Sequence, residues 1–322
     1  MAANPELIQA LEDSRTKGTY LRHELRRARI ESISTVDDAL AICDALRQID
    51  VYEDSAKRRS GWRSPLTTLG EYFLNPSSEA ATDAFFDEGL PLLLDYFNSR
   101  LDHVHYETDI LKRLDRVYRE QDRLQRDLLF VLWILAEYGS ERTAACIQRA
   151  FEQPIDPNDQ SWCRVFGAIT GDHPAIPEIA EQSVDSLPDG LCTIAFLDCM
   201  NLASIAGNLG NHPFDTEQGR EHLKGWIESA DELQFSYAQS AAASLPFIRN
   251  PERDQLLAVA MDHPDPPVQL EAAWASSRIG SESGLKMLAR FCMEPELGSI
   301  ACKYLVELGK EDMIPEEARE KQ

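Results

Sequence analysis

The sequence predicts an all-α fold, arranged as an α-α superhelix of stacked helix pairs. Three observations favour it: helical periodicity runs along the whole chain, strand signals are absent, and one phrase recurs every 29 to 40 residues. We find no sustained apolar–polar alternation flanked by Asn-Gly or Asp-Gly turns, the pattern that marks β-hairpins. The 322 residues suit two ordinary domains or one extended array.

Helical periodicity is clearest in segments 120–138, 189–206 and 266–279. The apolar face of the last segment has spacings of four, three and four residues and consists of Val268, Ala272, Ala275 and Ile279. Such spacings place side chains on one side of an α-helix. Segment 189–206 is apolar nearly all round, so we expect other helices to cover it on several sides and place it in the middle of the structure.

Capping signals predict where the helices begin. Asn or Asp can accept a backbone N–H at the N-cap, and proline suits the first helical position, where its missing N–H would have no partner. Five such pairs occur: Asn4-Pro5, Asn75-Pro76, Asp156-Pro157, Asn250-Pro251 and Asp265-Pro266. Ser34 and Asp37 have the spacing of a capping box. Together with the periodicity, these signals predict about sixteen helices joined by short loops.

The recurring phrase consists of an apolar helix that ends in Gly or Asn, a polar pair, and a new amphipathic helix. Its copies begin at Gly139, Gly171, Gly210, Asn250, Gly280 and Gly309. We expect the glycines just after a helix end, where the chain turns left-handed and a Cβ is penalised. A single helix pair cannot bury its own apolar face, whereas stacked neighbours can, so the repeat predicts a curved solenoid.

The best copy of the repeat runs from Asp262 to Ala289. Its helix start, small inward residues and helix stop are Asp265, Pro266, Val268, Ala272, Ala273, Ala275, Ile279 and Gly280. In these residues the copy resembles a HEAT-like repeat, the helical-pair module of armadillo-type solenoids, of a subtype similar to the repeats of phycobilisome lyases. It departs from that family's pattern at Gln269, Ser276 and Ser277.

Charge divides the chain at residue 64. Segment 1–64 carries 11 basic and 11 acidic side chains, whereas 65–322 carries the whole net charge of −23. We therefore predict an N-terminal helical cap or segment over 1–64 and the HEAT-like solenoid over 65–322. The first segment contains two basic runs: Arg22, Arg26, Arg27 and Arg29, and then Lys57, Arg58, Arg59 and Arg63. These residues either contact an anion or a partner, or form a solvated helix face offset by Glu24 and Glu31, or pair with the acidic body of the chain.

Composition excludes several classes of protein. A chain with a net charge of −23 and a pI near 4.7 repels phosphate backbones, so we expect no nucleic-acid partner. The longest apolar run, Leu128 to Ala136, is too short to span a bilayer, and we expect no membrane partner. The N-terminus has no signal-peptide pattern and the seven cysteines form no CxxC pair, which favours a reducing, cytoplasmic setting.

Chemical motifs are equally scarce. The sequence contains no GxxxxGK[ST], GxGxxG after a strand, HExxH or GxSxG. Two pairs could be read as metal or redox sites, or as ordinary structural residues: Cys192 with Cys199, and His103 with His105. Three histidines that precede proline could form a row of anion contacts or could be turn residues: His173, His212 and His263. We therefore predict no catalytic, cofactor-binding or metal-binding residue, and no cofactor.

Two further groups are expected to be structural. Adjacent carboxylates are typical of solvated surfaces or helix N-termini rather than acid/base pairs. The relevant acidic residues are Asp37, Asp38, Asp87, Glu88, Glu252, Asp254, Glu316 and Glu317. The five tryptophans are expected in the core, with one or two available as interface anchors: Trp62, Trp133, Trp162, Trp226 and Trp274.

These observations predict a non-catalytic, monomeric protein-binding or scaffold protein. Its curved, acidic helical-repeat surface would hold a protein partner with a basic face, because complementary potentials favour association. The alternative is an enzyme, since the resemblance implies two HEAT-like chemistries: bilin attachment or isomerisation, and DNA base excision. Base excision requires a basic groove, and residues 151–230 have a net charge of −10, which argues against it.

Overall fold

The structure is a computed structural model that describes residues 2–17, 19–57, 64–105, 116–184, 187–249 and 251–319. Helices make up the secondary structure of these residues, with short 3₁₀ segments, one π-helical turn at Phe85–Gly89 and an isolated bridge between Ile33 and Pro76, and with no strand. The predicted all-α class is therefore confirmed. The chain forms two compact units, Met1–Ile169 and Thr170–Gln322. The predicted boundary between 64 and 65 stays a prediction.

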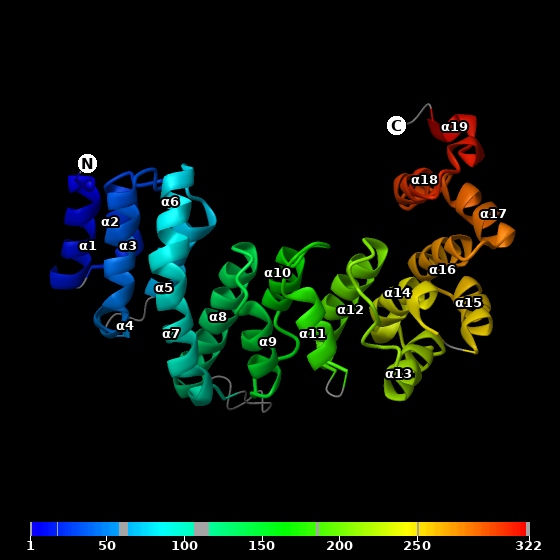
Figure 1. Cartoon of the computed structure of the whole chain (residues 1–322), viewed down its shortest axis with the longest axis horizontal. Helices are drawn as coiled ribbons and strands as arrows, with labels where there is room; N and C mark the ends of the chain where they lie inside the picture. Colours follow the sequence, from blue (N-terminus) through cyan, green and yellow to red (C-terminus); the bar gives the residue numbers. More distant parts are fainter. Residues whose placement is uncertain are drawn as a thin grey trace. The chain divides into compact units, whose positions relative to one another are not determined.

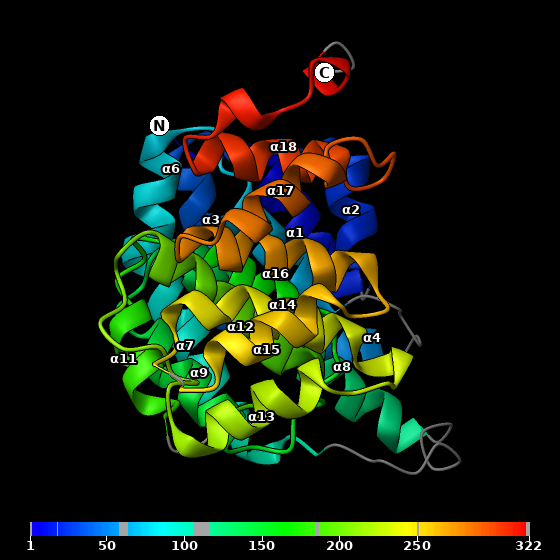
Figure 2. The same ribbon diagram turned by 90° about the vertical axis from the view of Figure 1, so that its right-hand side faces the viewer.

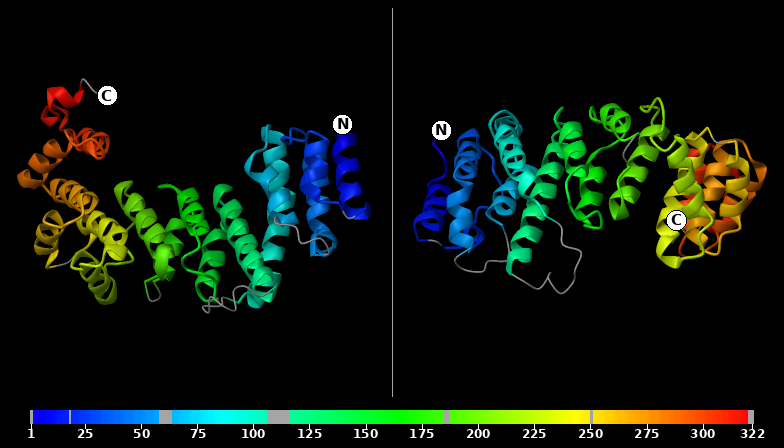
Figure 3. Two further views of the ribbon diagram at one scale, coloured as in Figure 1. Left: turned by 180° about the vertical axis from the view of Figure 1, so that it is seen from behind. Right: turned by 90° about the horizontal axis from the view of Figure 1, so that it is seen from below.

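Unit 1 contains ten α-helices in its described residues. They are α1 (Pro5–Lys17), α2 (Leu21–Arg27), α3 (Val36–Arg47), α4 (Ile49–Lys57), α5 (Pro65–Leu74), α6 (Glu79–Ala84), α7 (Leu90–Arg100), α8 (Arg116–Glu137), α9 (Thr143–Phe151) and α10 (Ser161–Ala168). Neighbouring helices of this unit pack side by side (Figures 1 and 3). The long helix α8 lies against α5, α7, α9 and α10. It is the predicted helix 120–138, and its face of Leu128, Val131, Leu132 and Leu135 is fully buried.

Unit 2 contains nine described α-helices. They are α11 (Ile176–Gln182), α12 (Gly190–Ile205), α13 (Glu217–Ile227), α14 (Phe235–Ser244), α15 (Arg253–Met261), α16 (Pro266–Arg278), α17 (Glu282–Phe291), α18 (Gly298–Glu307) and α19 (Glu316–Arg319). Figure 1 shows α14, α16 and α18 along one side of this unit and α13, α15 and α17 along the other, and Figure 2 shows their succession from α13 up to α18. Consecutive helices from α13 to α18 pack against each other.

Helix α16 is the best-buried element of unit 2. It packs against α15 and α17, as the sequence predicts, and also against α14. The predicted inward residues Val268, Ala272 and Ala275 are fully buried, whereas Ile279 follows the last helical residue and is 36% exposed. Small alanines on this face allow the neighbouring helices to approach closely.

Helix α12 matches the predicted segment 189–206, but its environment differs from the prediction. Phe196, Leu197 and Met200 are buried, whereas Leu202 is 57% exposed. One side of the helix therefore remains open to solvent. An apolar sequence predicts that a helix has neighbours, but not that these neighbours close around it completely.

Glycine ends the helices as predicted at Gly139, Gly280 and Gly309, where φ is 60°, 96° and 66°. At each of them the next residue donates to a carbonyl five positions earlier, as Ser281 N does to Ser276 O at 3.0 Å. This is the Schellman arrangement, which satisfies carbonyls at a helix C-terminus. The prediction is wrong at Gly171 and Gly210, which lack a positive φ. The left-handed glycine that follows α12 is Gly207, with φ 76°. Asn250 lies outside the described residues.

The predicted helix starts are only partly correct. Proline begins α1 at Pro5 and α16 at Pro266. Pro76 instead joins the isolated bridge, and α6 begins later, after Ser78, whose Oγ accepts from Ala81 N at 3.1 Å. Pro157 lies in a turn before α10, and Asn250-Pro251 is not fully described.

The predicted capping box at Ser34 and Asp37 is displaced by one residue. Thr35 is the N-cap of α3, and its Oγ1 accepts from Asp38 N at 3.1 Å. The Asp38 carboxylate accepts in turn from Thr35 Oγ1 at 2.8 Å and from Asn4 N at 2.6 Å. The bond from Asn4 ties α3 to the start of α1, a contact that the local sequence does not reveal.

Candidate functional site

A group of carboxylates lies on alternate helices of unit 2. Asp198 comes from α12, Glu271 from α16 and Glu307 from α18, and we call these three residues the acidic row. Helices α12 and α16 both pack against α14, whereas α16 and α18 are joined through side chains. The row therefore belongs to the side of unit 2 that carries the even-numbered helices (Figure 1).

Glu271 is the most buried member of the row, with only 9% of its surface exposed. Burial raises its pKa from the ordinary 4.5 to about 7, because the charged form loses its hydration. Hydrogen bonds from Tyr304 and Gln239 act against this rise, and the negative charge of Asp198 adds to it. Tyr304 Oη donates to Glu271 Oε1 at 2.7 Å. Near neutral pH this carboxyl group is therefore divided between its neutral and charged forms.

Asp198 is exposed, yet protein atoms surround its carboxylate closely enough to raise its pKa by desolvation. A hydrogen bond from Ser240 on α14 lowers the pKa and so opposes this rise. Because Asp198 also raises the pKa of Glu271, the two carboxylates influence each other electrostatically. Their repulsion would fall if a cation bound between them.

The third member of the row is anchored by an arginine. Arg278 Nη1 lies 3.0 Å from Glu307 Oε1, and the Arg278 guanidinium lies 5.5 Å from the centre of the Trp274 ring. Trp274 and Tyr304 have ring centres 5.6 Å apart. Residues 271, 274 and 278 share one face of α16 because they are separated by three and four positions. The contacts of this face join α16 to α18 over two helical turns.

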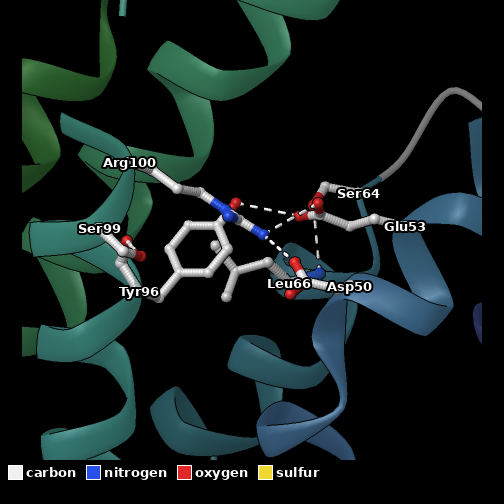
Figure 4. A network of polar contacts seen from close by, with 7 residues as sticks. All are labelled: Asp50, Glu53, Ser64, Leu66, Tyr96, Ser99 and Arg100. Carbon is white, nitrogen blue, oxygen red and sulfur yellow. Dashed lines mark hydrogen bonds and ion pairs between the residues drawn. The ribbon is translucent and has the colours of Figure 1, made fainter. Parts of the chain in front are cut away.

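A second polar network lies in unit 1 (Figure 4). Arg100 on α7 pairs with Glu53 on α4 at 3.2 Å and also with Asp50. Tyr96 Oη donates to the other oxygen of Glu53 at 3.1 Å, and the Arg100 guanidinium lies 4.4 Å from the Tyr96 ring centre. Glu53 is only 8% exposed, so the arginine compensates a buried charge. This network ties α4 to α7, with every carboxylate oxygen of Glu53 engaged.

Asp127 on α8 is another buried carboxyl, only 2% exposed. Burial raises its pKa to about 7, while hydrogen bonds from Ser64 and Thr67 oppose the rise. Thr67 Oγ1 donates to Asp127 Oδ1 at 3.1 Å. The contact joins α5 to α8 and is enclosed by the protein, so we assign it a structural role.

Sequence reasoning did not single out Glu53, Arg100, Asp127, Asp198 or Glu271. Two of them carried a usable signal, because each carboxylate interrupts an apolar helix face. Asp127 lies three residues after Leu124 and four before Val131. Glu271 has the same spacing from Val268 and Ala275. A carboxylate at such a position must find buried hydrogen-bond donors, which makes it a candidate for a perturbed pKa.

The three histidines that precede proline have one geometry in common. In each, Nδ1 accepts the N–H two residues later: His173 from Ala175 at 3.0 Å, His212 from Phe214 at 3.3 Å and His263 from Asp265 at 3.1 Å. The intervening proline has no N–H to offer, so the ring completes the turn. All three are buried. The turn interpretation therefore explains these residues, and they form no exposed row of anion contacts.

Both ring nitrogens of His212 have partners within the protein. With Nδ1 accepting, Nε2 carries the proton and faces Asn201 Oδ1 at 3.2 Å. Burial lowers the pKa of His212 to about 3, so the ring stays neutral at physiological pH.

The metal and redox readings of the sequence gain no support from the described residues. They contain no group of three or more His, Cys, Asp or Glu placed to hold a metal ion. Cys192 and Cys199 are both buried, and burial raises the pKa of the Cys199 thiol to about 12, which disfavours the thiolate. His103 and His105 are exposed at the end of α7 and just beyond it.

The tryptophans divide into two groups. Trp162 and Trp274 are core residues at 2% exposure, whereas Trp133 and Trp226 are half-buried. Trp62 lies outside the described residues. Trp133 Nε1 donates to Glu137 at 2.9 Å, and Arg164 lies 5.4 Å from its ring centre. Trp133 is therefore a partly exposed aromatic next to a cation.

The first basic run is mostly unpaired. Arg27 lies 3.7 Å from Glu24, whereas Arg22, Arg26 and Arg29 make no ion pair with any described residue. The acidic body of the chain therefore does not neutralise this run. In the second run, the side chain of Lys57 is not described, and Arg58, Arg59 and Arg63 lie outside the described residues.

The adjacent acidic pairs serve helix ends and surface ion pairs. Asp37 and Asp38 occupy the first turn of α3, and Glu316 and Glu317 the first turn of α19, where the helix dipole favours negative charge. Ion pairs account for three others: Glu88 with Arg47 at 2.9 Å, Glu252 with Lys224 at 2.8 Å and Asp254 with Arg253 at 3.2 Å.

Models of known protein families, curated proteins and solved structures include none that matches the chain. Among the described helices, none combines the length and apolar character needed to cross a membrane.

Proposed function

We propose that the chain is a non-catalytic protein-binding scaffold, built as a HEAT-like superhelix of helix pairs, whose acidic row holds a basic segment of a partner. We further propose that the protein is monomeric and cytoplasmic, a compartment in which its seven cysteines would stay reduced. It includes no nucleic-acid or membrane partner, because the net charge of −23 opposes both phosphate backbones and anionic lipid.

Two features support the repeat part of the proposal. Helices α13 to α18 pack in succession, with odd and even helices on opposite sides of unit 2 (Figure 1). Left-handed glycines follow α12, α16 and α18, so the same stop recurs on three even-numbered helices. A recurring helix stop with alternating sides is typical of stacked helical pairs.

The observation that carries the binding part is the acidic row. Asp198 on α12 and Glu307 on α18 are exposed, and Arg278 pairs with Glu307, whereas Glu271 on α16 is buried and contributes through its charge rather than by contact. Unit 2 as a whole has 26 acidic and 11 basic side chains, a net charge of −15. A negative surface of this kind favours a positive partner through complementary potential and faster encounter.

The test compares protein capture by the wild type and by an Asp198→Asn, Glu271→Gln, Glu307→Gln triple variant. Tagged proteins would be purified from the native cell, and retained proteins quantified by mass spectrometry at low and high salt. We expect one or more basic proteins to be lost from the variant and from the wild type at high salt, because screening weakens exposed charge contacts.

The matched control removes three carboxylates from the opposite side of unit 2, namely Glu221→Gln on α13, Asp254→Asn on α15 and Glu282→Gln on α17. It changes the net charge by the same amount as the triple variant. Equal capture by wild type, triple variant and control would contradict the role of the acidic row. Equal losses in the triple variant and the control would show that only net charge matters.

One observation favours the enzyme alternative. Glu271 has a pKa near 7 and is hydrogen-bonded to Tyr304, and Asp198 lies close enough to perturb it. Perturbed carboxylates of this kind cluster at catalytic sites. A HEAT-like enzyme of the bilin-lyase type would bind a tetrapyrrole in unit 2, and titration of the purified chain with bilin, followed by absorbance, tests this directly. An unchanged bilin spectrum would exclude that class.

A further inference from the structure

A groove of about 500 Å³ crosses four helices of unit 1. Its walls come from α2, α5, α8 and α10, which pack in that order, each against the next. It belongs to unit 1 alone and shares no residue with the acidic row. We call it the arginine groove, after Arg22, Arg26 and Arg164 in its lining.

The three arginines are available for a ligand. None of them lies within ion-pair distance of a carboxylate among the described residues, although at least eight other arginines do. Arg22 and Arg26 are one turn apart on α2 and so face the same way. Arg164 comes from α10 at the other end of the helix row. In a chain with 55 carboxylates, these three guanidinium groups of one groove thus have no ion-pair partner among the described residues.

The floor of the groove is aromatic. Phe130 and Trp133 lie one turn apart on α8, with ring centres 5.6 Å apart in an edge-to-face arrangement. Gly70 on α5 makes room for the Phe130 ring, since a Cβ at this glycine would lie 2.4 Å from Phe130 Cε1. The Arg164 guanidinium lies 5.4 Å from the centre of the Trp133 ring. A cation held over a ring in this way keeps its N–H edge free for a carboxylate.

The groove also contains two carboxylates, Glu31 and Glu71, so its five charged side chains sum to +1. This mixture disfavours a dense polyanion, which both carboxylates would repel. It suits separate single charges that can be placed beside the arginines and away from Glu31 and Glu71. An extended peptide with spaced carboxylates and one aromatic side chain meets both requirements of charge and shape.

We infer that the arginine groove is a docking site for an acidic peptide segment of another protein. Carboxylates of that segment pair with Arg22, Arg26 and Arg164, and its aromatic side chain packs on Trp133. Guanidinium groups bind carboxylates with two parallel hydrogen bonds, which gives both strength and orientation. This inference goes beyond the proposed function, because it concerns the other unit and a partner of the opposite charge.

The test uses fluorescence anisotropy with the full-length protein and short fluorescein-labelled peptides. The first peptide alternates Asp or Glu with Ser around a central Trp, the second has Lys at the acidic positions, and the third has Ala in place of the Trp. We expect the first peptide to bind, the second not to bind, and the third to bind more weakly. Binding of the lysine peptide as tightly as the acidic one, or no binding of the acidic peptide, would overturn the inference.

Variants of the groove arginines then test whether the peptide binds in the arginine groove. Arg22→Gln with Arg26→Gln, and Arg164→Gln alone, are each expected to weaken binding about tenfold or more, because each removes charge-assisted hydrogen bonds. Arg142→Gln is the matched control, since Arg142 is exposed, unpaired and outside the groove. Equal affinities of the groove variants and the control would refute the site. The two groove variants lie on different helices, so a folding defect in one, seen by circular dichroism, leaves the other informative.

Inorganic phosphate and ATP serve as competitors. If the groove binds peptide carboxylates, millimolar phosphate should displace the peptide no better than chloride at equal ionic strength. Displacement at low ATP concentration, with loss of ATP binding in the Arg22/Arg26 variant, would assign the groove to a nucleotide and overturn the peptide inference. The acidic-row triple variant should bind the acidic peptide as tightly as the wild type does. A negative result in the peptide test therefore leaves the proposed function of the acidic row untouched, and the reverse also holds.

Discussion

Replacing Glu271 by Gln should stabilise unit 2 at alkaline pH. The folded protein raises the pKa of Glu271 from the ordinary 4.5 to about 7, so the folded state holds a proton that the unfolded state releases. At about 1.4 kcal/mol for each pKa unit, a shift of about 2.5 units corresponds to about 3 kcal/mol. Stability from this group is fully present below pH 4.5 and is lost as pH rises to about 7. Above that pH the buried, charged Glu271 carboxylate lowers the stability of the folded state.

Glutamine removes this cost while keeping the shape of the side chain. Its Oε1 can still accept the hydrogen bond from Tyr304, which Glu271 accepts at 2.7 Å. We therefore expect the variant to match the wild type near pH 4 and to exceed it by up to about 3 kcal/mol at pH 8.

Hydrogen exchange followed by mass spectrometry is a suitable assay, because it reports on α16 and α18 separately from unit 1. That separation matters because Asp127 in unit 1 also has a pKa near 7 and adds its own pH dependence. Glu282→Gln, which removes an exposed carboxylate on α17, is the control for the loss of one negative charge. Parallel stability curves for wild type and Glu271→Gln from pH 4 to 8 would refute the reasoning.

Three further predictions concern packing and backbone. Ala272→Arg should destabilise by about 3–5 kcal/mol in a urea melt, since it buries an unpaired charge at a fully buried site, and an unchanged melt would show that the face is wrongly assigned. Gly280→Ala should lower the free energy of unfolding by about 1 kcal/mol or more, because φ is 96° at this position. Gly225→Ala on α13, where a Cβ would meet open space, should instead raise it by about 0.5–1 kcal/mol. Thermal melts that reverse this order would contradict the Schellman interpretation. Arg100→Met should destabilise unit 1 by about 3 kcal/mol in a urea melt at pH 7, because Glu53 would keep a buried charge without its cation, and an unchanged melt would contradict the role of this pair.

The sequence alone determined the all-α class, several of the helices and some of their ends. Segments 120–138, 189–206 and 266–279 appear as α8, α12 and α16, because an apolar period of 3.6 residues needs only local information. The helix stops at Gly139, Gly280 and Gly309 could likewise be predicted from the sequence, since a left-handed residue after a helix end depends on the few residues around it. The helix starts were less certain because several residues compete for each cap, as Thr35 and Ser34 show.

The tertiary structure decided which polar side chains meet. Glu271 and Tyr304 are 33 residues apart and Asp198 precedes Glu271 by 73, so no local pattern joins them. A carboxylate on an apolar face could be recognised in the sequence, but its pKa depends on which donors and charges the neighbouring helices supply. The same holds for the arginine groove. The sequence showed the run at Arg22 and Arg26, whereas only the packing of α2, α5, α8 and α10 brings this run into one groove with Arg164 and Trp133.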